Sequence, residues 1–318
     1  VVGRYDDAAS VAAVAIGSQV MQAVTGVILG LTTGITVLIG IATGAKDDRK
    51  TASIVGTGIW LFAVVAVVLT ALMVALYGQI AVWMHTPAEA MRDTEAYLWI
   101  CSMGIPFIIG YNVVCGILRG LGDSRTPLYF VALACVLNIV LDFILVGACG
   151  MRAAGAAAAT VTAQGASFAT ALGFLYRKGF HFEFTRRDIR PVRALCRRMV
   201  LLGAPIALQD LLVNLSFLLI TVIVNGMGVV ASAALGVVEK LIVFAMLPPM
   251  AIASAVAAMT AQNYGAGLRG RMRSCLRSGI AMALVFGVSV CVYSQFLPDT
   301  LTGIFTKDAA VMQMASGY

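Results

Sequence analysis

Eight long stretches of apolar residues follow one another along this chain of 318 residues. Each contains the ~20 residues that a helix needs to cross the ~30 Å hydrocarbon layer of a membrane. Because lipid offers the backbone no hydrogen-bond partners, stretches of this kind cross it as helices. The predicted spans are Ile16 to Gly44, Ser53 to Tyr77, Glu95 to Leu118, Leu128 to Ala148, Ala153 to Tyr176, Met199 to Val224, Ser232 to Gln262 and Cys275 to Leu297.

The composition excludes an ordinary soluble domain. The chain is 60% hydrophobic and 12% charged, whereas a typical soluble domain has roughly 25% charged residues. A soluble protein of this length would need charges along most of its helices to cover its surface. We therefore predict an all-α, polytopic membrane protein with eight transmembrane helices.

The basic residues lie mostly on one side of these spans. If the spans alternate in direction, 17 of the 22 Lys and Arg residues fall in connections on one side and four on the other, with Lys240 inside a span. The positive-inside rule places the basic side in the cytoplasm. We expect a multi-pass protein of the cell (plasma or inner) membrane. Its net charge of +7 then reflects topology and attraction to membrane lipid, with no nucleic-acid partner.

The sequence repeats itself weakly after 221 residues. Gly44-Ala45 falls on Gly265-Ala266, and both pairs end a long span and precede a basic loop. Six spans separate the two copies, so both have one orientation and are related by an axis along the membrane normal. This predicts a two-lobed transporter fold with six spans in each lobe.

The predicted division of the chain follows from the repeat. Residues 1–176 form an N-lobe that lacks its first helix, residues 177–198 form a basic cytoplasmic linker, and residues 199–318 form a partial C-lobe with three helices and the start of a fourth. We expect the complete protein to continue before Val1, and after Tyr318 by about 98 residues, as the repeat requires.

Four ionisable residues fall inside predicted spans: Asp142, Asp210, Glu239 and Lys240. A charge at the bilayer centre costs ~2.5 to 3.5 kcal/mol, so all four should face protein or a water-filled cavity. Asn138 and Asp142 are four residues apart and share one helix face. Spacing alone leaves two roles open for this pair: an exchangeable proton or cation site, or hydrogen bonds to a neighbouring helix worth ~0.6 kcal/mol. A pairing of Lys240 with Asp210 is the structural alternative to a cavity role for those two residues.

No sequence pattern indicates an enzyme. The chain contains neither H-E-x-x-H nor G-x-S-x-G, and no Gly-Lys dipeptide for a phosphate-binding loop. Its seven cysteines include no C-x-x-C pair and are typical of small packing residues. We expect no enzymatic activity, no metal and no cofactor, and any transport should draw on an ion gradient.

Four motifs carry a resemblance to a known family. Leu118 to Leu128 reads LRGLGDSRTPL, and Asn138-x-x-x-Asp142 follows it; Gly155 to Gln164 reads GAAAATVTAQ, and Ala261 to Gly267 reads AQNYGAG. In this order and spacing they closely resemble the signatures of multidrug and toxic compound extrusion (MATE) transporters, over essentially the whole chain. The first motif also has a local reading: Gly120 and Gly122 stop one helix, and Thr126 with Pro127 suit the N-cap and first turn of the next.

The resemblance implies particular site residues. In the branch similar to DNA-damage-inducible protein F, Asn138, Asp142 and Thr160 match three residues that line a cation-coupling site in the first lobe, and that site's first-helix Asp would lie just before Val1. In the other branch a coupling Glu follows Gly-x-Pro, and Val213 occupies its place here. We expect Gln209, Asp210, Glu239 and Lys240 to lie at a substrate cavity of the second lobe.

The resemblance implies a secondary active antiporter that exports amphipathic, often cationic, organic compounds in exchange for protons or sodium ions. Its partners would be such small molecules and membrane lipid, and we expect a monomer. One alternative is a flippase for lipid-linked saccharides from the same superfamily, although that cargo requires a strongly cationic cavity. The other is a truncated membrane protein without transport activity, because we expect this chain alone to be inactive.

Overall fold

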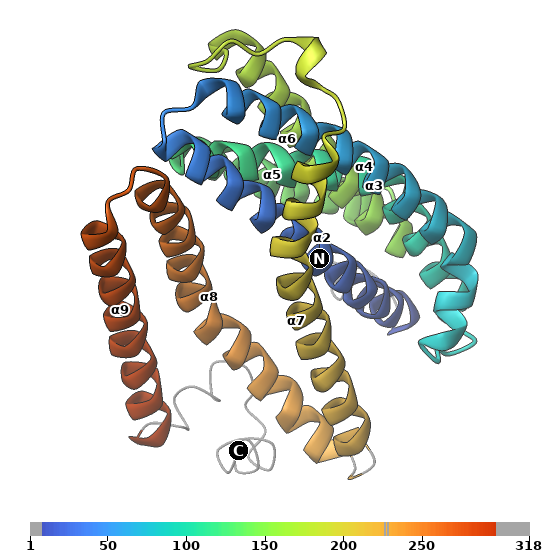
Figure 1. Ribbon diagram of the computed structural model, residues 1–318. Coiled ribbons are helices and arrows are strands. Elements are labelled where there is room, and N and C mark those ends of the chain that lie inside the picture. The colour runs from blue at the N-terminus through green and yellow to red at the C-terminus, as the bar shows by residue number, and fades with distance from the viewer. Residues whose placement is uncertain (1–7, 226, 228, 297–318) are drawn as a thin grey trace. The chain divides into compact units, whose positions relative to one another are not determined.

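The computed structural model describes residues 8–225, 227 and 229–296, and this part of the chain is helical without a strand (Figure 1). The long helices correspond one to one with the eight predicted spans and extend beyond most of them. A short π-helix, η1, continues α5, and a single 3-10 turn, η2, lies between α6 and α7. The elements are α2 (Ala8–Gly44), α3 (Asp48–Trp83), α4 (Met91–Leu121), α5 (Arg125–Asp142), η1 (Phe143–Ala148), α6 (Arg152–Lys178), η2 (Arg186–Asp188), α7 (Arg193–Asn225), α8 (Val229–Gly265) and α9 (Arg269–Phe296).

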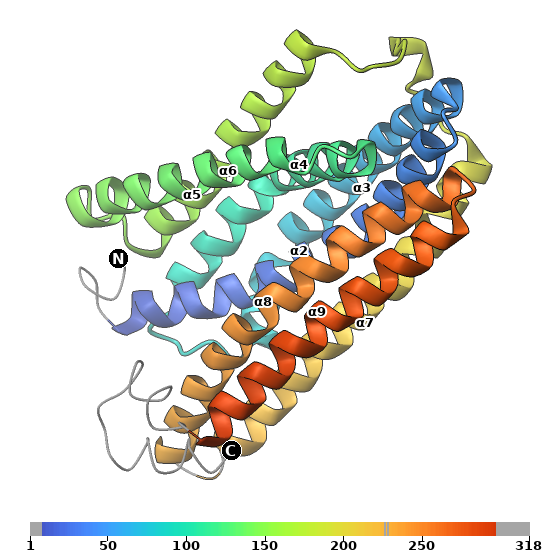
Figure 2. The same cartoon turned by 90° about the vertical axis from the view of Figure 1, so that its left-hand side faces the viewer.

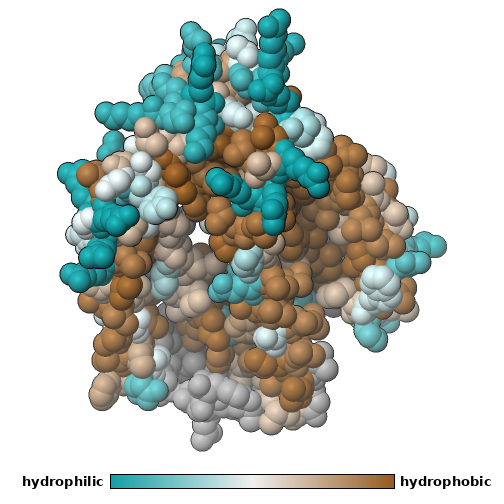
Figure 3. Space-filling view, in the orientation of Figure 1, coloured by the Kyte–Doolittle hydropathy of each residue, from teal (hydrophilic) through white to brown (hydrophobic). Residues whose placement is uncertain are grey.

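Seven helices of the described part are long and apolar enough to cross a membrane. The exception among the eight predicted spans is α6, which has 27 residues but is rich in alanine and carries Thr160, Thr162 and Gln164. A helix that turns polar side chains toward its neighbours needs less apolar surface than a helix surrounded by lipid. Large apolar side chains are exposed along the other helices, and Figure 3 shows the resulting hydrophobic surface. The chain is a polytopic, all-α membrane protein.

The contacts divide the chain into two compact units, residues 1–211 and 212–318. The boundary falls inside α7, so the first part of that helix belongs with the first unit. Within the first unit α4 is the central helix, since it contacts α2, α3, α5 and α6. In the second unit α8 packs against α9. The lobe boundaries predicted from the repeat stay a prediction.

The first part of α7 packs closely against α2. A methyl group added at Gly30 would overlap the backbone of Ala207, and one at Gly34 would overlap the carbonyl of Met199. Without side chains at these two glycines, the helix backbones can approach to a distance that any larger residue would prevent. Small residues serve this purpose at many helix contacts in membranes.

The predicted repeat is confirmed where α2 and α8 end. Both helices have 37 residues, and their boundaries are 221 residues apart. The turn after α2 contains the backbone hydrogen bonds Ala45 to Ile41, Lys46 to Thr43 and Asp47 to Ala42, and the turn after α8 repeats them at Ala266 to Gln262, Gly267 to Tyr264 and Leu268 to Asn263. The middle residue has a positive φ in both turns, 55° at Lys46 and 72° at Gly267.

The turn between α4 and α5 differs in detail from the prediction. Gly122, with φ 95°, ends α4 as expected, but Gly120 lies inside the helix, where its missing side chain leaves room for Thr36 and Ile39 of α2. The helix α5 begins at Arg125, so the predicted N-cap at Thr126 is wrong. Asp123 provides the cap instead, since its carboxylate accepts hydrogen bonds from the Thr126 amide at 3.0 Å and the Thr126 hydroxyl at 2.6 Å.

The two adjacent prolines do not interrupt α8. Pro248 and Pro249 lie inside a continuous helix, and Figure 1 shows α8 changing direction along its length. Proline removes an amide donor and its ring presses against the preceding turn, which bends a helix. The two prolines therefore bend α8 without breaking it.

Candidate functional site

Asn138 of α5 and Thr160 of α6 meet where these two helices pack together. The Asn138 side-chain amide donates a hydrogen bond to the Thr160 hydroxyl at 3.2 Å. The Thr160 hydroxyl in turn donates to the Ala156 carbonyl in its own helix at 3.0 Å. Both side chains are half-buried. Two of the three first-lobe residues named by the resemblance are thus in direct contact.

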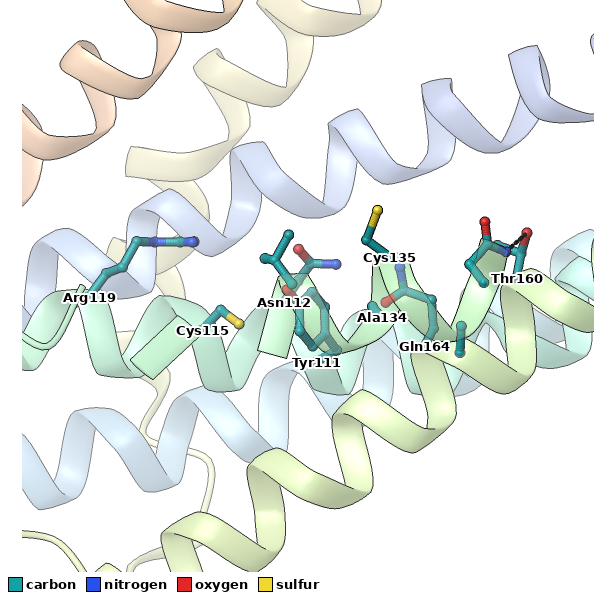
Figure 4. Close-up of a pocket in the computed structure, with 11 residues that line it drawn as sticks. Tyr111, Asn112, Cys115, Arg119, Ala134, Cys135, Thr160 and Gln164 are labelled. Atoms are coloured by element: carbon teal, nitrogen blue, oxygen red, sulfur yellow. Dashed lines mark hydrogen bonds between the residues drawn. The ribbon is translucent and has the colours of Figure 1, made fainter. Parts of the chain in front are cut away.

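These two side chains line one end of an elongated pocket. The pocket has a volume of about 410 Å³ and lies between α4, α5 and α6, and its lining includes Tyr111, Asn112, Arg119 and Gln164. Figure 4 shows the labelled side chains in a row, with Arg119 at one end and Thr160 at the other. The polar groups in this row are amides, hydroxyls and one guanidinium. The end at Thr160 offers oxygen ligands, whereas the end at Arg119 carries a positive charge.

Asp142 lies one turn beyond Asn138 and outside the lining of this pocket. It is the last residue of α5, directly before the π-helix η1. Its Oδ1 atom is buried and has no hydrogen-bond partner within the described residues. The carboxyl lies close enough to Tyr97 of α4 for the two groups to interact electrostatically. A buried oxygen without a partner is costly, and a proton or a monovalent cation would relieve that cost.

The π-helix is a structural feature that the sequence analysis missed. In η1 the Cys149 amide bonds to the Ile144 carbonyl at 2.9 Å, five residues back. Single π turns within α-helices occur frequently at functional sites. The stretch FILVGA contains no proline and is apolar throughout, so nothing in its pattern distinguishes it from a continuous α-helix.

The second-lobe candidates are divided between the two compact units, with Gln209 and Asp210 in the first and Glu239 and Lys240 in the second. Asp210 is half-buried and faces Gly26 of α2, whereas Gln209 is exposed. Glu239 accepts a hydrogen bond from the Thr221 hydroxyl at 3.0 Å, and the adjacent Lys240 is exposed. Asp210 belongs to the first compact unit and Lys240 to the second, so their pairing stays a prediction.

Sequence reasoning also missed part of the pocket lining. Its candidates came from ionisable groups inside spans and from the family resemblance, and so it passed over the polar side chains Asn112 and Gln164. The Gln164 Oε1 atom is buried without a hydrogen-bond partner within the described residues. An uncharged amide inside a predicted span was the available signal, because such groups are rare in apolar helices and face protein.

The sequence matches the MatE family over residues 1–144 and 205–318. Among curated proteins, it is 27% identical to the probable multidrug resistance protein YoeA of Bacillus subtilis over 321 residues, which cover 99% of this chain and 69% of that protein. It is 32% identical to the probable multidrug resistance protein YpnP of the same organism, with 84% of this chain and 59% of that protein covered. The chain thus spans about three fifths to two thirds of the length of these relatives.

Solved structures share the fold. A crystal structure of a MATE protein in complex with MaD3S superposes with a TM-score of 0.87 at 23% identity and covers 98% of this chain and 70% of that one. A MOP superfamily transporter from Pyrococcus furiosus superposes with a TM-score of 0.86 at 24% identity, with 98% and 69% covered. The family match extends over most of the chain and falls on both copies of the internal repeat. The chain therefore belongs to the MatE family of multidrug and toxic compound extrusion proteins.

Proposed function

We propose that the protein is a secondary active antiporter that exports amphipathic, cationic organic compounds in exchange for protons or sodium ions. The observation that carries this proposal is the buried Asp142 oxygen without a partner, next to the hydrogen bond between Asn138 and Thr160. Relatives that are called multidrug resistance proteins support the cargo class. The basic connections would lie on the cytoplasmic side of the cell membrane.

The coupling step follows from the position of Asp142. A proton or sodium ion entering from outside binds its carboxylate and removes an uncompensated negative charge from among apolar helices. The helices around it, α4, α5 and η1, then prefer a different packing, because the two charge states have different partners. When the proton or sodium ion is bound, the cargo cavity has a low affinity for the cationic cargo. Binding of the ion therefore releases the cargo, and the two are transported in opposite directions.

An efflux assay with the protein expressed from its complete gene tests this proposal. Asp142→Asn should abolish efflux driven by a proton or sodium gradient, while Asp142→Glu should retain part of it. Asp188→Asn in the exposed α6–α7 connection is the matched control and should transport normally. Proton- or sodium-driven efflux by Asp142→Asn at the wild-type rate would refute the mechanism.

The flippase for lipid-linked saccharides is a second candidate, favoured by one observation. Arg119 lines the pocket at the end opposite Thr160, and a guanidinium is suited to a phosphate. A pyrophosphate would need more cations than this one, which is why the antiporter is preferred. Arg119→Gln separates the two functions, because it should abolish saccharide flipping but leave export of a cation intact.

A further inference from the structure

A large groove lies on α3, α4 and α6, apart from the candidate site. Its volume is about 970 Å³, at the upper end of the range for small-molecule pockets. Buried side chains form its floor, among them Phe62, Ile109 and Ile117. At its mouth Val67 is 69% exposed and Tyr176 is 91% exposed, so the groove is open to what surrounds these helices.

The connection between α6 and α7 closes one end of the groove. Three phenylalanines of this segment line it: Phe180 stacks on Phe182 at 5.0 Å between ring centroids and meets Phe184 edge-on at 5.3 Å. All three pack against the hydrophobic core of the first unit. They cover what would otherwise be an open end of the groove.

The same connection is fixed to the start of α3. The Thr57 hydroxyl donates to the Arg190 carbonyl at 3.2 Å, and the Asp188 backbone occupies the space that a side chain at Gly56 would fill. Figure 2 shows this segment leading from α6 toward α7. The end wall of the groove is therefore part of the folded first unit.

The lining of the groove is apolar except for a positive charge at one end. Among the described residues that line the groove, Arg186 alone is charged, and it lies at the end formed by the connection. No carboxylate lines the groove, and no ion pair of Arg186 occurs within the described residues. Arg187 and Arg190 follow in the same segment. The groove thus combines an apolar body along three long helices with a positive charge beyond the end of α6.

We propose that this groove binds an anionic phospholipid, with an acyl chain along α3, α4 and α6 and the phosphate at Arg186. Basic pockets beside spanning helices are suited to anionic head groups, and an open mouth among lipid-facing side chains admits a chain laterally. A cationic cargo finds no acidic partner here. The groove shares no lining residue with the pocket between α4, α5 and α6, and its occupation does not depend on the proposed function.

Photo-crosslinking tests the proposal directly. The protein expressed from its complete gene is reconstituted in phosphatidylcholine vesicles that contain a trace of phosphatidylglycerol with a diazirine on its acyl chain. After illumination, adducts are mapped by peptide mass spectrometry. We expect them to concentrate on groove residues of α3, α4 and α6. Unlabelled phosphatidylglycerol should compete at least fivefold better than phosphatidylcholine.

Two variants and their controls examine the two halves of the site. Ala63→Trp places an indole in the groove and should lower adduct formation more than fivefold. Val64→Trp, on the neighbouring face of α3 and outside the groove, should change it less than twofold. Arg186→Gln should lower the preference for the anionic lipid about fivefold. Arg187→Gln, adjacent but outside the lining, should leave this preference unchanged.

The wild-type map alone can overturn the proposal, whatever the variants do to folding. Adducts spread evenly over all lipid-facing helices would mean that no site exists. Equal competition by the two phospholipids would mean that the head group is not recognised. Adducts displaced by a hydrophobic organic cation and not by phosphatidylglycerol would identify the groove as a route for cargo, and the lipid assignment would be wrong.

Discussion

The side chain of Asn138 on α5 donates a hydrogen bond to the hydroxyl of Thr160 on α6, 22 residues further along the chain. Within the described part of the chain, this contact directly links two of the side chains that the family resemblance assigns to the first-lobe site. It also borders the pocket between α4, α5 and α6. Its role can be separated from simple helix packing by comparing stability with transport.

Replacing Thr160 by Val should leave the protein folded and remove coupling. A single hydrogen bond between membrane helices contributes ~0.6 kcal/mol on average, so melting temperature should fall only slightly. Ion-driven efflux by the complete protein should fall at least tenfold, and Thr160→Ser should restore it. The control is Thr170→Val, because the Thr170 hydroxyl on the same helix donates to the Ala166 carbonyl of its own helix at 2.8 Å. Efflux that follows stability in all three variants would assign the contact to packing alone.

The cap on α5 should make stability depend on pH. Partial burial alone would raise the pKa of Asp123, but its hydrogen bonds from Thr126 and the charge of Lys178, 3.7 Å away, together hold the pKa of this carboxyl below its ordinary value. A lowered pKa gives a stabilisation that is complete above the unfolded value of about 3.9 and is lost as pH falls through the lower folded value.

Asp123→Ala should therefore cost ~1 kcal/mol at pH 7, measured as a lower melting temperature in detergent. The difference from wild type should shrink as the pH is lowered below about 4. Lys178→Gln should cost less, because a half-exposed ion pair contributes ~0 to 1 kcal/mol. A difference that grows toward acid pH would contradict the assigned cap.

The close contact between α2 and α7 should tolerate no side chain at Gly30. A methyl group there meets the backbone of Ala207, which cannot move aside as a flexible side chain can. Gly30→Ala should lower the melting temperature clearly, since overpacking typically costs ~1 to 3 kcal/mol. The matched substitution is Gly173→Ala on α6, where nothing lies within 4 Å of the added carbon. Gly173→Ala should be neutral or stabilising by up to ~1 kcal/mol. Equal losses of melting temperature for the two variants would contradict the close contact between α2 and α7.

The bond between Thr221 and Glu239 should fix the contact of α7 with α8. The Thr221 hydroxyl donates to Glu239 at 3.0 Å. Glu239→Gln keeps an acceptor at this position and should retain most of the stability, whereas Glu239→Ala leaves the Thr221 hydroxyl without this partner and should cost ~1 kcal/mol or more. Urea or thermal denaturation in detergent measures the difference. Gln and Ala variants of equal stability would show that the bond contributes nothing.

The sequence alone predicted the features that depend on residues close together in the chain. Apolar length located the spans, and the pattern at Gly44 and Gly265 located two equivalent helix ends, because both signals are local. The proximity of Asn138 and Thr160 came from family resemblance, since no local pattern indicates which helices are neighbours. The functional roles of these residues and of Asp142 stay predictions.

Other features depend on packing and had no local signal. The cap at Asp123 lies three residues before the predicted one at Thr126, because helix ends can shift along a turn rich in Gly, Asp and Ser. The π-helix after Asp142 lies in a stretch with ordinary apolar composition. The end wall of the groove, made by Phe180, Phe182 and Phe184, forms only when the α6–α7 connection folds back onto α3.

The two turns that follow α2 and α8 show how a backbone shape can survive a change of residue. Gly267 adopts its positive φ without strain, but Lys46 in the equivalent turn has a side chain, and the left-handed conformation then costs roughly 1 to 2 kcal/mol. The three backbone bonds that both turns share must hold Lys46 there against this preference. The shared geometry is thus maintained in the first copy by its hydrogen bonds, and in the second it also suits glycine.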